Sequence, residues 1–194
     1  MVWLVLGVII FMTPHILASF RSRAPGNIRD KVGYPVYMIA FSIVSAIGLG
    51  LMIFGYDQAR LDPAYSTPVW IAPEWTRHII LAVMPFAMIL LVAAYAPTGY
   101  IKKYSKHPML TAVKAWALVH LIYNGDWPSI ILFGSILAFG GLSRTMARIR
   151  KDNGARDADA RIMGDVVAVV GGLATTAILI AFLHEFLTGR PVLV

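Results

Sequence analysis

Five histidines stand out among the residues of this sequence that can bind a metal or carry a proton. They are His15, His78, His107, His120 and His184. Imidazole is a common metal ligand and titrates near neutral pH. Cysteine is absent from the 194 residues, which excludes disulfides, iron–sulfur clusters, thiolate-ligated haem and a cysteine nucleophile.

His15 lies within a long apolar run, and its close neighbours, Met-Thr-Pro before it and Ile-Leu after it, carry no charge. An ionisable side chain inside a membrane costs about 3 kcal/mol or more unless it is paired. A neutral imidazole at this position therefore needs a partner from another helix. That partner can be a polar side chain, a water molecule or a metal, and the sequence leaves the three open.

His120 shares one face of an expected helix with Trp116 and Asn124. Asn124 is placed to hydrogen-bond one ring nitrogen of His120 and so to fix the tautomer that binds a metal. His107 and Lys114 lie together on another face of the same helix. Lys114 is the one cation well inside a span, where it can extend to the interface or pair with an acidic group such as a haem propionate.

Two neutral histidines without a thiolate favour bis-imidazole iron, as in a b-type haem held between helices. His15 and His120 are candidates for such ligands, and His107, Trp116, Asn124 and Lys114 are secondary candidates for contact with the cofactor. A zinc or copper site would want a third close ligand, and no HxxH or HExxH spacing occurs. His78 and His184 lie near the ends of apolar runs, where a histidine costs little.

The elements that must position these side chains are membrane-spanning helices. Hydrophobic residues make up 58% of the chain, charged residues 14%, and the mean hydropathy is +0.71. A soluble domain has roughly 45–50% apolar and about 25% charged residues. We therefore predict an all-α, polytopic transmembrane bundle that forms a single domain over residues 1–194, with about six spans. Their predicted ranges are 2–20, 34–56, 79–95, 108–123, 128–142 and 166–187.

Two local features refine this prediction. Residues 108–123 and 128–142 are short and are joined by Asn-Gly-Asp-Trp, which is typical of a tight turn, so we expect a helical hairpin. Residues 2–20 have basic residues after them and none before them, which is the reverse of a signal peptide. We expect this run to be a span.

The basic residues predict the orientation. Of the seventeen, thirteen fall in residues 21–33, 96–107 and 143–164. Lys and Arg concentrate in cytoplasmic loops, so we expect both termini on the periplasmic side of a bacterial inner membrane. The net charge of +7 then points to the lipid bilayer as the partner rather than to nucleic acid.

Beyond these patterns, the sequence resembles the NnrU family. The resemblance lies in His107-Pro108-Met109, in Trp116 to His120, in the Asn124-Gly125-Asp126 turn, and in the first run that leads to His15. NnrU proteins are bacterial inner-membrane proteins linked to denitrification, near genes for nitrite and nitric oxide reduction. The resemblance implies a redox, sensing or assembly component of that metabolism, with nitrogen-oxide reductase components as partners.

Zeta-carotene isomerases are distant relatives of this family and use b-type haem with two histidine ligands. By resemblance these ligands fall on His15 and His120, and the histidine of the His-Pro pair falls on His107. The isomerases have a cysteine in the turn before the second ligand, where this chain has Ala117. Three functions therefore stay open: a haem protein of nitrogen-oxide metabolism, a haem-dependent polyene isomerase, and a membrane protein without a cofactor.

Overall fold

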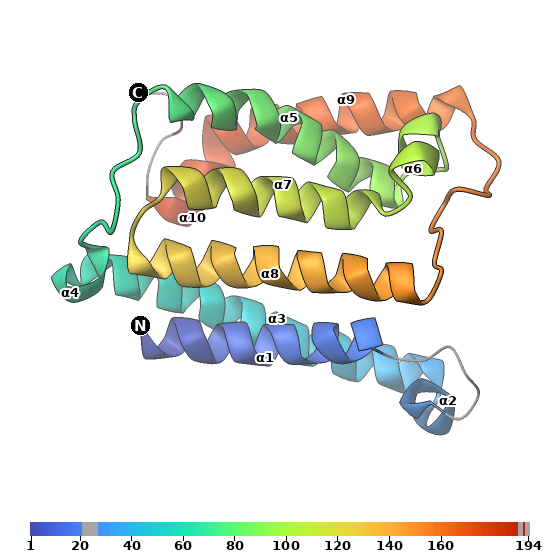
Figure 1. Ribbon diagram of the computed structural model, residues 1–194, viewed down its shortest axis with the longest axis horizontal. Helices are drawn as coiled ribbons and strands as arrows, with labels where there is room; N and C mark the ends of the chain where they lie inside the picture. The colour runs from blue at the N-terminus through green and yellow to red at the C-terminus, as the bar shows by residue number, and fades with distance from the viewer. Residues whose placement is uncertain (21–26, 190–191, 193–194) are drawn as a thin grey trace. The chain divides into compact units, whose positions relative to one another are not determined.

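The computed structural model describes residues 1–20, 27–189 and 192, and all of its regular elements in these ranges are helices. Residues Arg21, Arg23 and Arg190, which entered the orientation argument, lie outside the described residues. The helices are α1 (Val2–Phe20), α2 (Ile28–Val32), α3 (Tyr34–Leu61), α4 (Pro63–Ser66), α5 (Thr76–Tyr95), α6 (Tyr100–Ser105), α7 (Pro108–Tyr123), α8 (Trp127–Ile149), α9 (Ile162–Ile178), the π-helical segment η1 (Leu179–Leu183) and α10 (His184–Thr188) (Figure 1).

The predicted spans correspond closely to these helices, and the all-α, polytopic class is confirmed. In the described part of the chain, five helical stretches are long and apolar enough to cross a membrane: α1, α3, α5, α8 and Ile162–Phe186. The shorter apolar helix α7 is the sixth. α1 and α7 have the predicted bounds, whereas α3 and α8 continue beyond them to Leu61 and Ile149.

The backbone groups into two units that are described separately. The first contains residues 1–70 and 124–146, and the second contains residues 71–123 and 147–194. α7 belongs to the second unit and most of α8 to the first, so the predicted hairpin stays a prediction. The single domain over residues 1–194 likewise stays a prediction.

In the first unit, α1 and α3 pack closely along their lengths (Figure 1). Glycines permit this approach: a Cβ added at Gly7 would lie 2.5 Å from the backbone nitrogen of Met52, and one at Gly48 would lie 2.5 Å from that of Phe11. Small residues at membrane helix contacts let backbones come together and gain dispersion contacts.

α8 joins this pair through polar contacts near both ends. The hydroxyl of Tyr56 on α3 lies 2.9 Å from that of Ser129, and the hydroxyls of Ser19 on α1 and Ser143 lie 2.7 Å apart. α8 begins at a capped end, because a carboxylate oxygen of Asp126 accepts a hydrogen bond from the backbone N–H of Ser129 at 2.8 Å. These bonds fix where α8 lies against α1 and α3.

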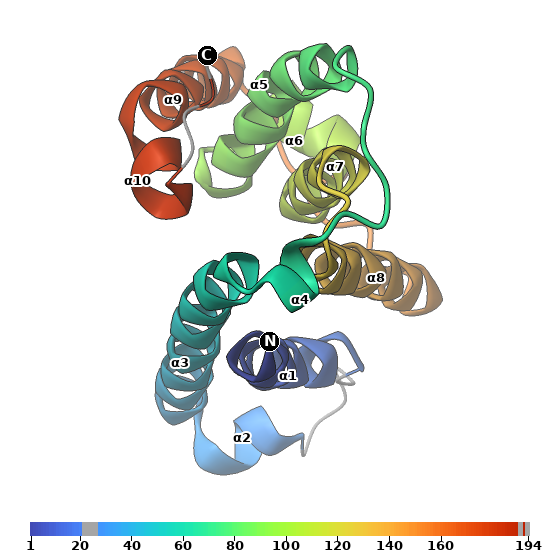
Figure 2. The same ribbon diagram turned by 90° about the vertical axis from the view of Figure 1, so that its left-hand side faces the viewer.

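In the second unit, α5 lies between α9 and α7 (Figure 2). A Cβ at Gly172 would lie 2.5 Å from the Cα of Ile89, so this glycine allows α9 to pack closely on α5. α7 starts with Pro108, a residue suited to the first helical position because its missing N–H has no partner there in any case.

The polar end of the second unit is tied by hydrogen bonds between two loops. The carboxylate of Asp165 accepts from the backbone N–H groups of Tyr100 and Ile101 at 2.9 and 2.8 Å. The backbone N–H of Arg161 donates to the carbonyl of Thr98 at 2.9 Å, and that of Ala155 donates to the carbonyl of Lys106 at 3.1 Å. The loop after α8 is therefore folded onto the α6 region.

Candidate functional site

His15 lies on α1, half-buried among three phenylalanine rings of the first unit. Its ring stacks on Phe11 at 4.3 Å between centroids, lies 4.8 Å from Phe41 on α3, and meets Phe139 on α8 edge-on at 5.8 Å. Rings from three helices thus hold the imidazole in an apolar environment. This agrees with the apolar run in which His15 lies in the sequence.

The Nδ1 atom of His15 lies 2.7 Å from the carbonyl oxygen of Phe11, four residues earlier. A carbonyl oxygen only accepts, so Nδ1 carries the proton in the neutral ring, and Nε2 carries the lone pair. Metal-binding histidines commonly donate their other N–H to a backbone carbonyl in this way. His15 is therefore held in the tautomer that ligates through Nε2.

His120 repeats this arrangement on α7 of the second unit. Its Nδ1 lies 2.8 Å from the carbonyl oxygen of Trp116, again four residues earlier, and the two rings are 5.3 Å apart. The expected contact with Trp116 is confirmed. The same argument assigns the proton to Nδ1 and the lone pair to Nε2.

The other residues proposed around His120 have different positions. At Nδ1, the Trp116 carbonyl fills the tautomer-setting role that we expected of Asn124, which lies in the turn after α7 and is half-buried. A hydrogen bond from Asn124 to His120 stays a prediction. Lys114 is half-buried on α7, and its pairing with a haem propionate stays a prediction too.

His107 forms its hydrogen bond through the other ring nitrogen. Its Nε2 lies 3.0 Å from the carbonyl oxygen of Asp152, a residue of the loop after α8. Nε2 therefore carries the proton, and its hydrogen bond fastens this loop next to the start of α7. This contact gives His107 a structural role that its sequence neighbours did not reveal.

His78 and His184 differ in environment. His78 is exposed near the start of α5, whereas His184 is half-buried directly after the π-helical segment. Thr188 donates its hydroxyl proton to the carbonyl of His184 at 2.8 Å, and its oxygen lies 3.3 Å from the Nδ1 of His184. Since that hydroxyl proton is already used, the oxygen accepts from Nδ1, and His184 also carries its lone pair on Nε2.

Comparison with known protein families shows to which family the chain belongs. The family model described as NnrU protein matches residues 3–192, which is nearly the whole chain. The chain belongs to the NnrU family. No curated protein and no solved structure matches it.

The NnrU match covers all five histidines and both units. Sequence reasoning proposed His15 and His120 as ligands from their types and positions, and that role stays a prediction. It did not predict the π-helical segment before His184, because residue patterns do not show a change of helix type.

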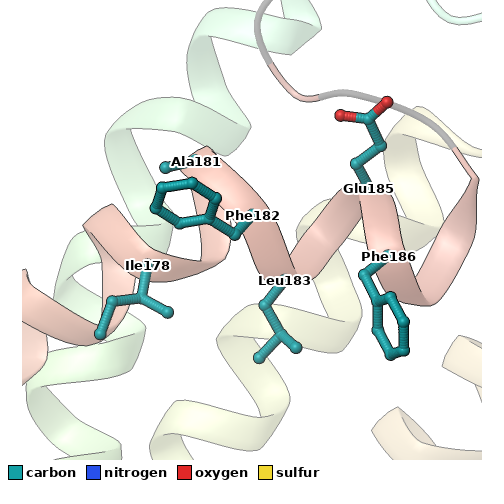
Figure 3. A pocket seen from close by; sticks show the side chains of 6 residues that line it. All are labelled: Ile178, Ala181, Phe182, Leu183, Glu185 and Phe186. Atoms are coloured by element: carbon teal, nitrogen blue, oxygen red, sulfur yellow. The ribbon is translucent and has the colours of Figure 1, made fainter.

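An open hollow of about 570 Å³ lies along the C-terminal helix of the same unit (Figure 3). It is lined by Ile178, Ala181, Phe182, Leu183, Glu185 and Phe186. All six belong to one continuous helical stretch and all are exposed. On a membrane-spanning helix, such an apolar face suits contact with lipid.

Proposed function

We propose that this NnrU-family membrane protein binds b-type haem, and that His15 and His120 would hold its iron. The observation that supports this most directly is the shared hydrogen bonding of the two rings. Each Nδ1 is fixed on the carbonyl four residues earlier, at 2.7 Å for His15 and 2.8 Å for His120, so each Nε2 is the nitrogen that can accept a metal.

The surroundings of the two rings also suit haem. Phe11, Phe41 and Phe139 around His15, and Trp116 beside His120, supply flat apolar surface of the kind that a porphyrin contacts. Haem iron needs only two further ligands from the protein, and imidazole is a usual one. When bound, haem would supply one-electron redox chemistry.

The residues of the chain would hold this group and limit its contact with water. The two imidazoles set the positions of the iron ligands, and the phenylalanines exclude water from the His15 side. Lys114 would neutralise a propionate at the α7 side, at the half-buried position that it occupies. His107 would take no direct part, because its Nε2 is bonded to Asp152.

We place this haem protein in the inner membrane of a bacterium, with both termini in the periplasm, as a redox, sensing or assembly component of nitrite and nitric oxide metabolism. The family resemblance supports that role, with nitrogen-oxide reductase components as partners. The multi-pass membrane character rests on the helices themselves.

The test is the haem content of protein purified from haem-replete cells. Wild type is expected to retain haem, whereas His120→Ala and His15→Ala are expected to lose it at least about tenfold faster. His78→Ala is the matched control, because His78 is exposed on a helix of the same protein. A correctly folded wild-type protein without haem would overturn the proposal.

A polyene isomerase is the second candidate. It is favoured by the position of both imidazoles on apolar helices, where a carotenoid-sized hydrocarbon would reach them from the bilayer. Membranes containing the reduced haem protein would then change the isomer ratio of added cis-zeta-carotene. An unchanged ratio with haem present would leave the nitrogen-oxide role.

A cofactor-free protein is the third candidate, and the same hydrogen bonds give it a basis. Because each imidazole already bonds to its own helix, neither has a wholly unsatisfied ring. In that case His15→Ala would lower stability through lost contacts with Phe11 and Phe41 and would change no chromophore.

A further inference from the structure

Arg60, in the last turn of α3, carries a positive charge that is largely buried in the first unit. Its side chain is 12% exposed, and that of its ion-pair partner Asp126 is 14% exposed. The Nε atom of Arg60 lies 3.8 Å from a carboxylate oxygen of Asp126, which is within ion-pair range but too long for a hydrogen bond. The guanidinium carbon lies 5.2 Å from the ring centre of Tyr56, and a ring supplies no oxygen acceptor.

The guanidinium group of Arg60 is therefore short of acceptors. It has five N–H donors, yet within the residues that the structure describes it makes no hydrogen bond. A buried charge is costly unless it is both paired and hydrogen-bonded. The nitrogen atoms of Arg60 also keep some exposed surface, because they are not among the fully covered atoms that lack a partner. An acceptor from outside the chain can therefore reach them.

Asp126 is held at its distance from Arg60 by its role as a helix cap. The carboxylate oxygen that does not face Arg60 accepts a hydrogen bond from the backbone N–H of Ser129 at 2.8 Å. The turn that carries Asp126 is fixed as well, because the carbonyl of Gly125 accepts from the backbone N–H of Val69 at 2.7 Å. The carboxylate is thus shared between the positive start of α8 and Arg60, and it neutralises the guanidinium charge only in part.

The ring of Tyr56 is fixed on the other side of the guanidinium group. Its hydroxyl oxygen lies 2.9 Å from that of Ser129, and its ring meets that of Phe133 edge-on at 6.3 Å between centroids. Both neighbours of the Arg60 charge are therefore anchored to α8. The unused N–H groups belong to a cation that is already positioned, so an incoming anion has little ordering cost to meet.

The length of α3 places Arg60 at the depth of the lipid head groups. With 28 residues, α3 is about 42 Å long, whereas the hydrocarbon core of a bilayer is about 30 Å thick. The last turn of α3 therefore extends beyond the core. Trp70 and Trp127 of the same unit are 38% and 49% exposed, and tryptophan is enriched at this interface.

We propose that Arg60, held between Tyr56 and Asp126, binds one phosphate group through its free N–H donors. A guanidinium group can donate two parallel hydrogen bonds to phosphate oxygens, and such charge-assisted bonds are among the stronger ones in proteins. A phospholipid head group and free inorganic phosphate share this chemistry, and the depth of Arg60 favours the lipid. The site uses neither His15 nor His120, so it stands independently of haem binding.

Thermal unfolding of protein purified in maltoside micelles tests this site. Phosphatidylglycerol is titrated in one series and inorganic phosphate in another, and the unfolding midpoint is followed by circular dichroism. A ligand that binds the folded state raises the midpoint as its concentration rises. Wild type is expected to show a saturable rise. In Arg60→Gln the half-maximal rise should need at least about tenfold more ligand, because the charge-assisted hydrogen bonds are lost.

Two further variants control this comparison. Arg60→Lys keeps the charge but not the planar fork, so it should weaken the response at least about threefold. It also decides the question if Arg60→Gln lacks wild-type helical circular dichroism. Arg29→Gln is the matched control, because Arg29 also lies over a tyrosine ring, 5.4 Å from the centre of Tyr34, near the opposite end of α3. It should keep the wild-type response.

The two titrations separate the two sources of phosphate. A response to phosphatidylglycerol alone, weakened by the changes at Arg60, identifies a lipid head group as the ligand. A response to inorganic phosphate that is weakened in the same variants identifies the free anion. Equal responses of wild type and the folded Arg60 variants would overturn the site, and so would a wild-type protein that responds to neither compound.

Discussion

A histidine in a helix can donate a hydrogen bond to the backbone carbonyl four residues earlier. This hydrogen bond distinguishes His15 and His120 from His107. It holds His15 and His120 with the lone pair on Nε2. His107 uses Nε2 itself for a bond to Asp152. The residue types and apolar neighbours of His15 and His120 could be read from the sequence. The bond of His107 could not, because its partner lies 45 residues away.

At the residue scale, His107→Ala should loosen the loop at residues 151–161 without affecting haem. The change removes one half-buried hydrogen bond, which typically contributes about 1 kcal/mol. Limited proteolysis of this loop in detergent should become faster, while the haem content stays at the wild-type level.

Asp152→Ala is the informative comparison for that prediction, because it keeps the backbone carbonyl that His107 contacts. Its side chain bonds instead to the backbone N–H of Gly154 at 2.9 Å. Loss of haem from His107→Ala, with an unchanged loop, would show that His107 serves the cofactor rather than the loop.

At the element scale, the sequence predicted the helices better than their ends. The second span was predicted to end at residue 56, before Asp57, yet α3 continues to Leu61. Arg60 is accommodated because it lies 3.8 Å from a carboxylate oxygen of Asp126 and 5.2 Å from the ring centre of Tyr56. Tertiary structure brings Asp126 to Arg60, and helix geometry brings Tyr56, which is four residues earlier. A count of charges along the chain could not reveal either partner.

The π segment is the element that sequence patterns missed entirely. Residues 166–187 were predicted as one regular span, and they contain Leu179–Leu183 in π geometry. Nothing in an apolar run such as Leu-Ile-Ala-Phe-Leu predicts whether its backbone hydrogen bonds span five residues, as in a π-helix, or four, as in an α-helix. The π segment therefore became visible only with the backbone.

The packing of α1 on α3 can be tested with two glycines of the same helix. A Cβ at Gly48 would lie 2.5 Å from the backbone of Phe11, whereas none of the surrounding atoms comes within 4 Å of one at Gly50. Gly48→Ala should destabilise the protein by about 1–3 kcal/mol through overpacking. Gly50→Ala should be neutral or stabilising by up to about 1 kcal/mol, because alanine favours the helix.

Thermal unfolding in detergent, followed by circular dichroism, measures the difference between these two variants. The account expects a clearly lower midpoint for Gly48→Ala than for Gly50→Ala. Equal midpoints would mean that α1 and α3 do not pack through this glycine.

At the scale of the whole molecule, composition and hydropathy were sufficient to predict a polytopic helical membrane protein. The family match over residues 3–192 agrees with the resemblance found from the His107-Pro108 pair and the Asn124-Gly125-Asp126 turn. What the sequence could not supply is the division of the backbone into two units. That division depends on which helices pack together, and apolar runs of similar composition do not show which helices will be neighbours.

The predicted orientation is testable because the natural chain has no cysteine. A single cysteine at Lys103→Cys should be protected from a membrane-impermeant maleimide in intact cells, and one at Glu74→Cys should react. The reason is the excess of Lys and Arg in the loops around residue 103. Labelling of Lys103→Cys but not of Glu74→Cys would reverse the topology.

The most direct measurement of the central claim is the absorption spectrum of detergent-purified protein, oxidised and then reduced with dithionite, for wild type, His15→Ala and His120→Ala. The account predicts a Soret band and sharp reduced bands of low-spin b-type haem in wild type, and strong loss of these bands in both His15→Ala and His120→Ala. A folded wild-type protein from haem-replete cells with a featureless spectrum would contradict it.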